Sequence, residues 1–133
     1  MSRHRYDCQV RFSDVDVYGH VNNVKYFEYY QEARLAFLAS LRDERPVGEP
    51  PFGVVVARLD VDYLRPILFR AETYAVESWV TEVGRSSFRL GAEIADDGLV
   101  LSRAAAVMVV YDVERQAARP LTEWERQRLG ELL

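Results

Sequence analysis

A cluster of polar residues near the N-terminus has the types and spacing needed for chemistry on a carbonyl group. Residues 14–23 read D-V-D-V-Y-G-H-V-N-N and are followed by a long apolar run. We expect a turn that leads into a helix N-terminus, where main-chain N–H groups lack partners within the helix and can bind a ligand oxygen. A carboxylate opposite these groups, from Asp14 or Asp16, can attack a carbonyl carbon or deprotonate the attacking water. Gly19 would let the ligand approach the backbone closely.

The same residue types also have common structural roles in such a turn. Aspartate before a helix often caps the helix or closes an Asx turn, and asparagines do the same. A single histidine, His20, is typical of a structural position at a helix start, and the tyrosine-rich helix face is typical of a core. The local pattern therefore leaves catalysis and turn formation both open.

Composition argues against several other functions. The chain has 133 residues, of which 49% are hydrophobic and 29% charged, the balance of an ordinary globular domain. The single Cys8 cannot form an internal disulfide, and without a histidine cluster no zinc site is expected. A net charge of -4 argues against binding nucleic acid by bulk electrostatics. No apolar run is long enough to span a membrane and no signal-peptide core is present, so we expect a cytoplasmic protein.

Other catalytic signatures are missing from the sequence. It contains no G-x-S-x-G elbow, no phosphate-binding loop and no H-E-x-x-H motif. These absences argue against serine hydrolase, nucleotide phosphate and zinc protease chemistry. We expect neither a metal nor another cofactor.

The hydrophobic pattern predicts one long helix and five strands. Residues 5–12 alternate as a half-buried strand, and four later segments have strand character, at residues 53–64, 71–83, 86–95 and 100–112. The helix is expected at residues 23–42 with Asn22 as its N-cap, and its apolar arc is wide enough for a sheet to wrap around it. Arg34 falls within that arc, so we expect a carboxylate or carbonyl partner for it, because an unpaired buried charge is costly.

Short connections between the later strands imply antiparallel pairing of neighbours. Near the C-terminus, Thr122 and Glu125 have the spacing of a capping box at the start of a short helix. With no internal repeat, we expect a single domain over residues 1–133. The pattern predicts an α+β hotdog fold, in which a five-stranded antiparallel sheet wraps around one long helix and a short C-terminal helix follows. The open sheet edge would invite pairing between subunits.

The N-terminal motif resembles the signature of a known enzyme group. The run D-V-D-V-Y-G-H-V-N-N-V-K-Y-F-E-Y-Y-Q-E-A-R is similar to that of hotdog-fold acyl thioesterases of the 4-hydroxybenzoyl-CoA thioesterase-like group, which includes bacterial long-chain acyl-CoA thioesterases. Its H-V-N-N-V-K-Y core also resembles the motif of plant acyl-ACP thioesterases. The segments D-Y-L-R-P at residues 62–66 and G-R-S-S-F at residues 84–88 fall where the group has similar segments. The resemblance thus covers most of the chain.

The resemblance implies a role for each residue of the motif. Asp16 matches the catalytic carboxylate, and the amide near Asn23 matches the donor that polarises the thioester carbonyl. His20 joins them as a supporting group of the catalytic set, while Asp14 shapes the turn. Other hotdog thioesterases use a helix carboxylate; here Glu32 is expected on the wet face or beside the arginine of the helix. The expected substrate-binding residues are Tyr18, Gly19, Asn22, Val24, Arg65, Arg85, Ser86 and Ser87.

A CoA substrate carries several negative charges, so an acidic protein needs a local arginine patch to bind it. Arg85, with its two neighbouring serines, is the main candidate, and Arg65 and Arg89 are further ones. Solvated surface arginines would look the same in sequence.

These observations lead to a thioester hydrolase as the first hypothesis. The substrate would be acyl-CoA, or an acyl carrier protein thioester, and the site would lie at a subunit interface of a homodimer or homotetramer. A hotdog enoyl-thioester hydratase and a non-catalytic acyl-CoA-binding protein are the alternatives. Thiol release separates the first hypothesis from both.

Overall fold

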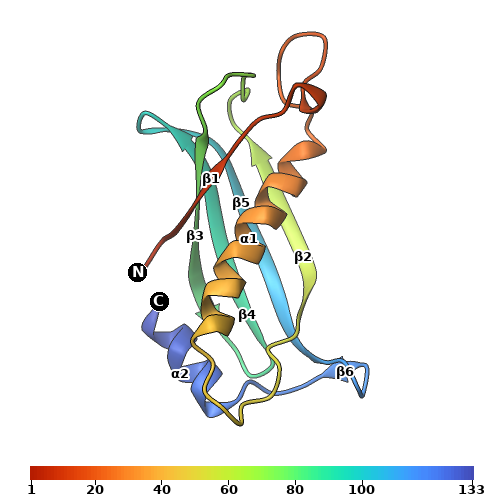
Figure 1. Cartoon of the computed structure of the whole chain (residues 1–133), viewed down its shortest axis with the longest axis vertical. Helices are drawn as coiled ribbons and strands as arrows, with labels where there is room; N and C mark the ends of the chain where they lie inside the picture. The colour runs from red at the N-terminus through yellow and green to blue at the C-terminus, as the bar shows by residue number, and fades with distance from the viewer.

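The chain folds into one curved antiparallel sheet with a long helix lying across it (Figure 1). A computed structural model describes the whole chain, residues 1–133. Its elements are β1 (His4–Cys8), a 3-10 turn (Phe12–Asp14), α1 (Lys25–Asp43), β2 (Val54–Tyr63), β3 (Tyr74–Val83), β4 (Ser87–Asp96), β5 (Leu99–Asp112), β6 (Ala117–Ala118) and α2 (Glu123–Glu131). The strand order is β1-β3-β4-β5-β2, with the short β6 paired to β5. All pairs are antiparallel, as the short connections predicted.

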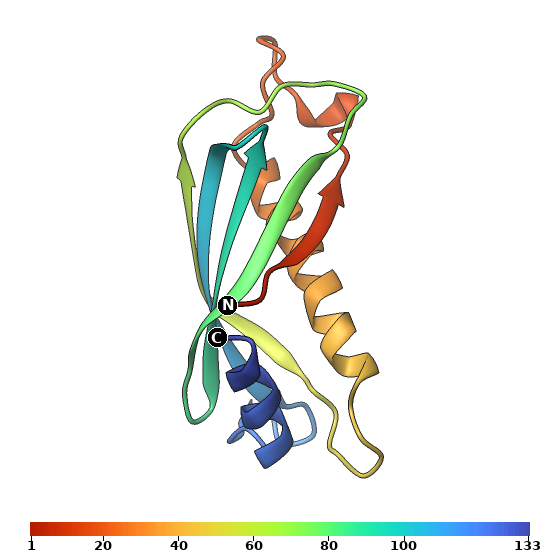
Figure 2. The ribbon, with the colours of Figure 1, turned by 90° about the vertical axis from the view of Figure 1, so that its left-hand side faces the viewer.

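The sheet curls around α1, as Figure 2 shows from the side. The helix buries one face against the sheet, namely Tyr26, Tyr29, Tyr30, Ala33, Arg34, Phe37, Leu38 and Leu41. Burial of these large side chains provides most of the driving force that holds the helix on the sheet. The predicted hotdog arrangement, a sheet wrapped around one long helix, is confirmed.

Several predicted boundaries need correction. The first strand ends at Cys8 rather than at residue 12, because Arg11 N donates to Asp14 Oδ2 (3.0 Å) and the chain bends there into the 3-10 turn. The long helix begins at Lys25, not at residue 23, because the side chain of Asn22 accepts a hydrogen bond from Val24 N (3.0 Å). This Asx turn delays the helical conformation by two residues. The sheet has a sixth strand, β6, which is only two residues long.

The two ends of the sheet carry different groups. The turn with the two aspartates, the start of α1 and the end of β2 lie at one end, which is uppermost in Figure 1. At the other end, the short helix α2 has the predicted capping box, in which Glu125 N donates to Thr122 Oγ1 (3.1 Å) and Thr122 N donates to Glu125 Oε1 (2.8 Å). No helix of the chain is both long and apolar enough to cross a membrane.

The two sheet edges differ in length. At one edge, β1 has five residues, whereas β2 at the other edge has ten and pairs only with β5. Two apolar side chains of this long edge strand, Val55 and Val56, stay exposed. A long edge with free backbone groups and exposed apolar side chains is suited to pairing with another chain.

Candidate active site

The two aspartates of the N-terminal turn have opposite environments. Asp14 is fully buried, and its carboxylate accepts hydrogen bonds from Tyr29 Oη (2.7 Å) and from Arg11 N (3.0 Å) and Nη2 (3.1 Å). Burial by itself would raise the pKa of Asp14, but the hydrogen bonds from Tyr29 and Arg11, with the arginine charge, hold this pKa below its usual value. Asp14 is thus an ionised anchor of the turn, the shaping role predicted for it.

Asp16 closes the loop that follows and remains exposed. Its Oδ1 accepts hydrogen bonds from Tyr18 N (2.9 Å) and His20 N (3.2 Å), and its own N–H donates to the carbonyl of His20 (2.8 Å). Gly19 makes the reversal with φ +74°, a conformation that favours glycine. Because both bonds to the carboxylate use Oδ1, its second oxygen makes no hydrogen bond within the chain and is free to meet a ligand.

The start of α1 offers an unused hydrogen-bond donor. Asn22 N donates to the carbonyl of Asp14 (2.8 Å), and the carbonyl of Asn22 accepts from Lys25 N (2.9 Å). Between them, the N–H of Asn23 makes no hydrogen bond within the chain. The carbonyl of Asn23 is held by the hydroxyl of Tyr63 at the end of β2 (3.0 Å), which fixes the residue in place.

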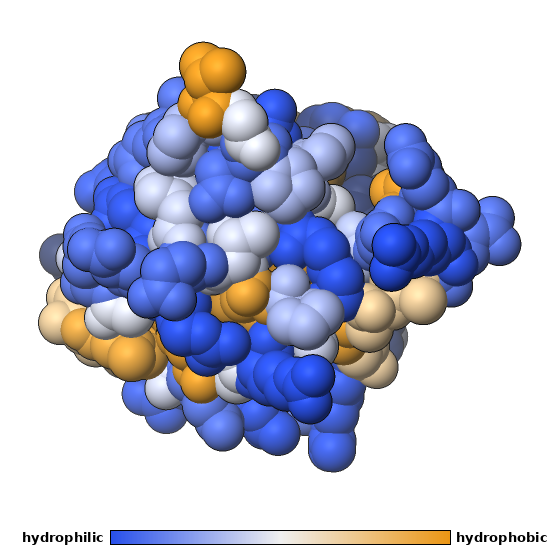
Figure 3. Space-filling view, turned by 90° about the horizontal axis from the view of Figure 1, so that it is seen from below, coloured by the Kyte–Doolittle hydropathy of each residue, from blue (hydrophilic) through white to orange (hydrophobic).

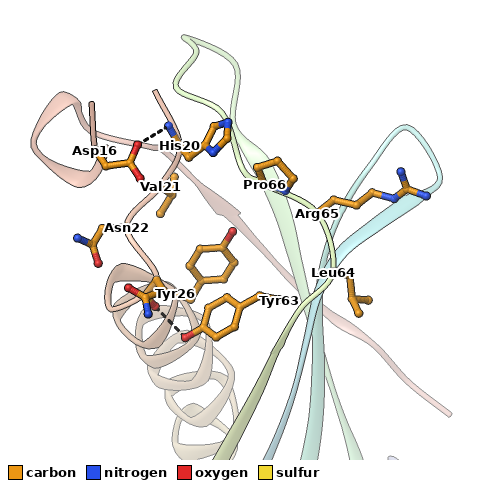
Figure 4. A pocket seen from close by; sticks show the side chains of 10 residues that line it. Asp16, His20, Val21, Asn22, Tyr26, Tyr63, Leu64, Arg65 and Pro66 are labelled. Atoms are coloured by element: carbon orange, nitrogen blue, oxygen red, sulfur yellow. Dashed lines mark hydrogen bonds between the residues drawn. The ribbon is translucent and has the colours of Figure 1, made fainter. Parts of the chain in front are cut away.

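A pocket of about 380 Å³ brings these groups together (Figure 4). Its lining comes from the turn, the start of α1 and the segment after β2, and consists of Asp16, His20, Val21, Asn22, Asn23, Tyr26, Tyr63, Leu64, Arg65 and Pro66. Figure 4 shows Asp16 and His20 on one side and Tyr63 with Pro66 across from them. The pocket thus combines an exposed carboxylate with a free main-chain donor, which is the pair that acyl transfer to water requires.

Most of the residues predicted from the sequence lie in or beside this pocket. Asp16, His20, Asn22, Asn23 and Arg65 line it. Tyr18 and Gly19 lie in the loop that Asp16 closes, and Val24 is an exposed residue just before α1. The guanidinium of Arg65 points away from Asp16 in Figure 4.

The remaining predicted residues lie at the opposite end of the sheet. Arg85, Ser86 and Ser87 are in and just after the turn from β3 to β4, where the carbonyl of Arg85 accepts a hydrogen bond from Leu121 N (2.9 Å). Strand β3 has ten residues, so this turn is about 30 Å from the pocket of the same chain. The surface at this end is largely hydrophilic, with separate small hydrophobic areas (Figure 3).

The sequence argument missed Tyr26 and Tyr63 as pocket residues. Their rings meet edge to face with centroids 4.8 Å apart, so they form one wall at the mouth between α1 and β2. The motif D-Y-L-R-P, which contains Tyr63, only added to the resemblance. A tyrosine at the end of a strand that faces the helix is nevertheless a signal for a residue of the pocket wall. No group of three or more His, Cys, Asp and Glu side chains in the chain is placed to hold a metal ion.

An antiparallel sheet wrapped around one long helix defines the hotdog-fold class of proteins. A family model described as the thioesterase-like superfamily matches residues 10–129. The chain therefore belongs to the thioesterase-like superfamily, and it is a thioester hydrolase.

Individual relatives agree with this assignment. The chain is 27% identical over 127 residues to the long-chain acyl-CoA thioesterase FadM of Escherichia coli, covering 94% of this chain and 96% of the relative. It is 32% identical to a thioesterase of Thermus thermophilus whose crystal structure was solved with coenzyme A and zinc, with a TM-score of 0.78 and coverage of 96% and 92%. A predicted thioesterase of Bacillus stearothermophilus, 20% identical, has the same fold, with a TM-score of 0.85 and coverage of 99% and 97%.

Proposed function

We propose that the protein hydrolyses acyl-CoA to a carboxylic acid and CoA, with Asp16 as the catalytic carboxylate. The observation that carries this proposal is the shared pocket, in which a free oxygen of Asp16 and the free N–H of Asn23 are both available to a ligand. The names of the relatives support the substrate class, since one is a long-chain acyl-CoA thioesterase and another was crystallised with coenzyme A.

The chemistry follows from these two groups. The thioester carbonyl oxygen accepts a hydrogen bond from Asn23 N, which stabilises the negative charge that develops on this oxygen when the carbon is attacked. Asp16 attacks the carbon itself or takes a proton from the water that attacks, and both routes need its ionised form. The C–S bond then breaks and the thiolate leaves, taking up a proton to become the free thiol. When water attacks, the acid forms directly; when Asp16 attacks, water then hydrolyses the anhydride formed on Asp16 and releases the acid.

The loop around Asp16 prepares this carboxylate for either route. The N–H groups of Tyr18 and His20 hold Oδ1, so the carboxylate cannot rotate freely and its second oxygen keeps a fixed direction. The His20 side chain lies at the pocket wall beside it, where it supports the position of the substrate. A fixed carboxylate lowers the entropy that must be lost on reaching the transition state.

We further propose that the working enzyme is an oligomer in which a second copy completes the CoA site. Antiparallel pairing of two β2 edges would place the lower end of one sheet beside the upper end of the other. Arg85 of the second copy would then lie three strand spacings, about 15 Å, from the β2 end that carries Tyr63. A cationic turn at that distance suits the phosphates of CoA while the acyl part stays in the pocket.

Replacing Asp16 by Asn tests the catalytic assignment. The asparagine Oδ1 can keep both hydrogen bonds from the loop, so we expect an unchanged fold, while kcat/KM for a panel of acyl-CoAs should fall by roughly 10²- to 10⁴-fold. Thiol release is the measurement, and Asp43→Asn, an exposed position at the far end of α1, is the matched control. An Asp16→Asn protein that retains near-full turnover would refute the assignment.

A further inference from the structure

Arg34 in the middle of α1 is a largely buried arginine for which the chain provides no partner, although its nitrogen atoms keep some contact with solvent. Its residue is only 9% exposed, and it makes no ion pair and no hydrogen bond within the chain, although the sequence led us to expect a carboxylate or carbonyl beside it. Glu32, the nearest helix carboxylate, is exposed and does not pair with it. Burial lowers the pKa of Arg34, with no carboxylate to oppose the effect. A charge in this position favours a ligand group that can compensate it.

The Arg34 side chain lines a narrow cavity between α1 and the sheet. The cavity is bounded by Tyr30 and Arg34 of the helix and by Leu59, Ser78, Leu90, Ala92, Ala104 and Ala106 of strands β2 to β5. Its space is about 10 Å³, room for one water-sized group. Three of its wall residues are alanines, so the sheet leaves space opposite the arginine where larger side chains would fill it. The buried hydroxyl of Ser78 adds a second polar group to the wall.

This inner cavity continues the line of the active-site pocket. Tyr26 and Tyr63 belong to the active-site pocket, whereas Tyr30, one helical turn further, and Leu59, four residues back along β2, belong to the inner cavity. Arg34 lies nine helical steps, about 14 Å, beyond Lys25, and Asn23 lies two residues before the helix, so the two residues are roughly 16 Å apart. A linear chain that starts at the carbonyl site and follows the seam between α1 and β2 therefore ends at the arginine.

We propose that the inner cavity binds a carboxylate at the far end of the acyl chain, so that the preferred substrates are thioesters of dicarboxylic acids. This proposal rests on the proposed function, because it takes the thioester carbonyl to lie at Asn23. The guanidinium of Arg34 would hold the carboxylate with two hydrogen bonds, and the hydroxyl of Ser78 would contact it as well. A methyl-ended chain of the same length would cover the guanidinium without giving it a partner.

A ligand fits the cavity better than a group from a second copy of the chain. The lining residues come from α1 and from four strands of the sheet, so the cavity lies in the layer between the helix and the sheet. A substrate would enter this layer from the pocket, where Tyr26 and Tyr63 lie between the two elements, and would displace the half-buried side chain of Leu59 to widen the cavity.

The test compares pairs of acyl-CoAs of equal chain length that end in a methyl or a carboxyl group. For chains that span about 16 Å, wild-type kcat/KM should favour the carboxyl-ended member by roughly 10- to 100-fold, the effect of a hydrogen bond to a charged group. Arg34→Met should abolish or reverse this preference, and Arg34→Lys should retain part of it. Arg45→Met, an exposed arginine beyond the end of α1, is the control and should keep the wild-type preference.

The outcomes separate the proposal from its alternatives. A wild-type preference for methyl-ended chains, or an equal loss on both members in Arg34→Met, would overturn it. A change in the oligomeric state of Arg34→Met, measured by light scattering, would also overturn the proposal, because it would show that the arginine contacts a second copy. If neither acyl-CoA of a pair releases thiol, the proposed function fails. Calorimetric binding of the same two thioesters then still decides whether Arg34 recognises the carboxyl end.

Discussion

Removing the hydroxyl of Tyr29 should destabilise the protein more than removing the hydroxyl of its neighbour Tyr30. Both lie on the buried face of α1 and both donate a hydrogen bond of 2.7 Å. Tyr29 donates to the carboxylate of Asp14, whereas Tyr30 donates to the neutral hydroxyl of Ser102. A hydrogen bond to a charged group contributes about 1.5–3 kcal/mol and one between neutral groups about 0.5–1.5 kcal/mol.

The burial of Asp14 decides which end of this range applies. Its side chain has no exposure, so water cannot replace the donor that Tyr29→Phe removes, and Arg11 remains as the only partner of the carboxylate. We expect a loss of about 2–3 kcal/mol for Tyr29→Phe and about 1 kcal/mol for Tyr30→Phe in the free energy of unfolding at neutral pH. Urea denaturation of both variants and the wild type measures the difference.

The pH dependence of the same experiment gives a second check. The pKa of Asp14 is lowered in the folded protein, so its contribution to stability is present above the usual carboxyl range and is lost as pH falls through that range to the lowered value. Tyr29→Phe raises the pKa of Asp14 in the folded protein towards its usual value. The difference in free energy of unfolding between wild type and variant should therefore narrow in acid. Equal losses for the two variants, or a gap that does not change with pH, would refute the reasoning.

Two further predictions concern the active site. Tyr63→Phe keeps the edge contact with Tyr26 but removes the hydrogen bond to the carbonyl of Asn23, so kcat should fall by roughly 2- to 10-fold with little change in melting temperature; a fall in melting temperature that matches the loss of activity would instead indicate a structural role. If a second copy supplies Arg85, co-refolding Asp16→Asn with Arg85→Ala should restore thiol release above that of either variant alone, because one site of the mixed dimer is intact. If the mixture shows no gain, either Asp16 and Arg85 of one chain belong to the same site, or Arg85 takes no part in the site.

The sequence predicted the elements that depend on periodic burial. The wide apolar arc of the helix and the alternation of the strands reflect contacts with the core, and these side chains form the two clusters of the hydrophobic core. The turn around Asp16 could also be predicted, because an aspartate, a glycine and asparagines before a helix have local conformational preferences. Both kinds of signal are encoded within a few residues of the feature they predict.

Features that depend on distant parts of the chain could not be predicted from the sequence in the same way. Helix α1 starts two residues later than predicted because the side chain of Asn22 accepts a hydrogen bond from the backbone of Val24. The lack of a partner for Arg34 depends on which side chains the opposite strands present to it. Tyr63 joins the pocket because β2 ends opposite the helix N-terminus, about 40 residues away in sequence. The separation of Arg85 from the pocket likewise follows from the direction of β3, which periodicity does not indicate.

The contrast between Asp14 and Asp16 has a consequence for how this protein tolerates genetic change. In a library of variants scored for cellular abundance, Asp14 should be among the least tolerant positions, since a substitution leaves the hydroxyl of Tyr29 and the backbone of Arg11 without their acceptor. Asp16, exposed and held only by backbone donors, should be nearly neutral in that score and intolerant in a score of activity. Two aspartates two positions apart thus allow the reaction to be lost while the protein accumulates normally, which is the first step by which an enzyme fold can become a binding protein.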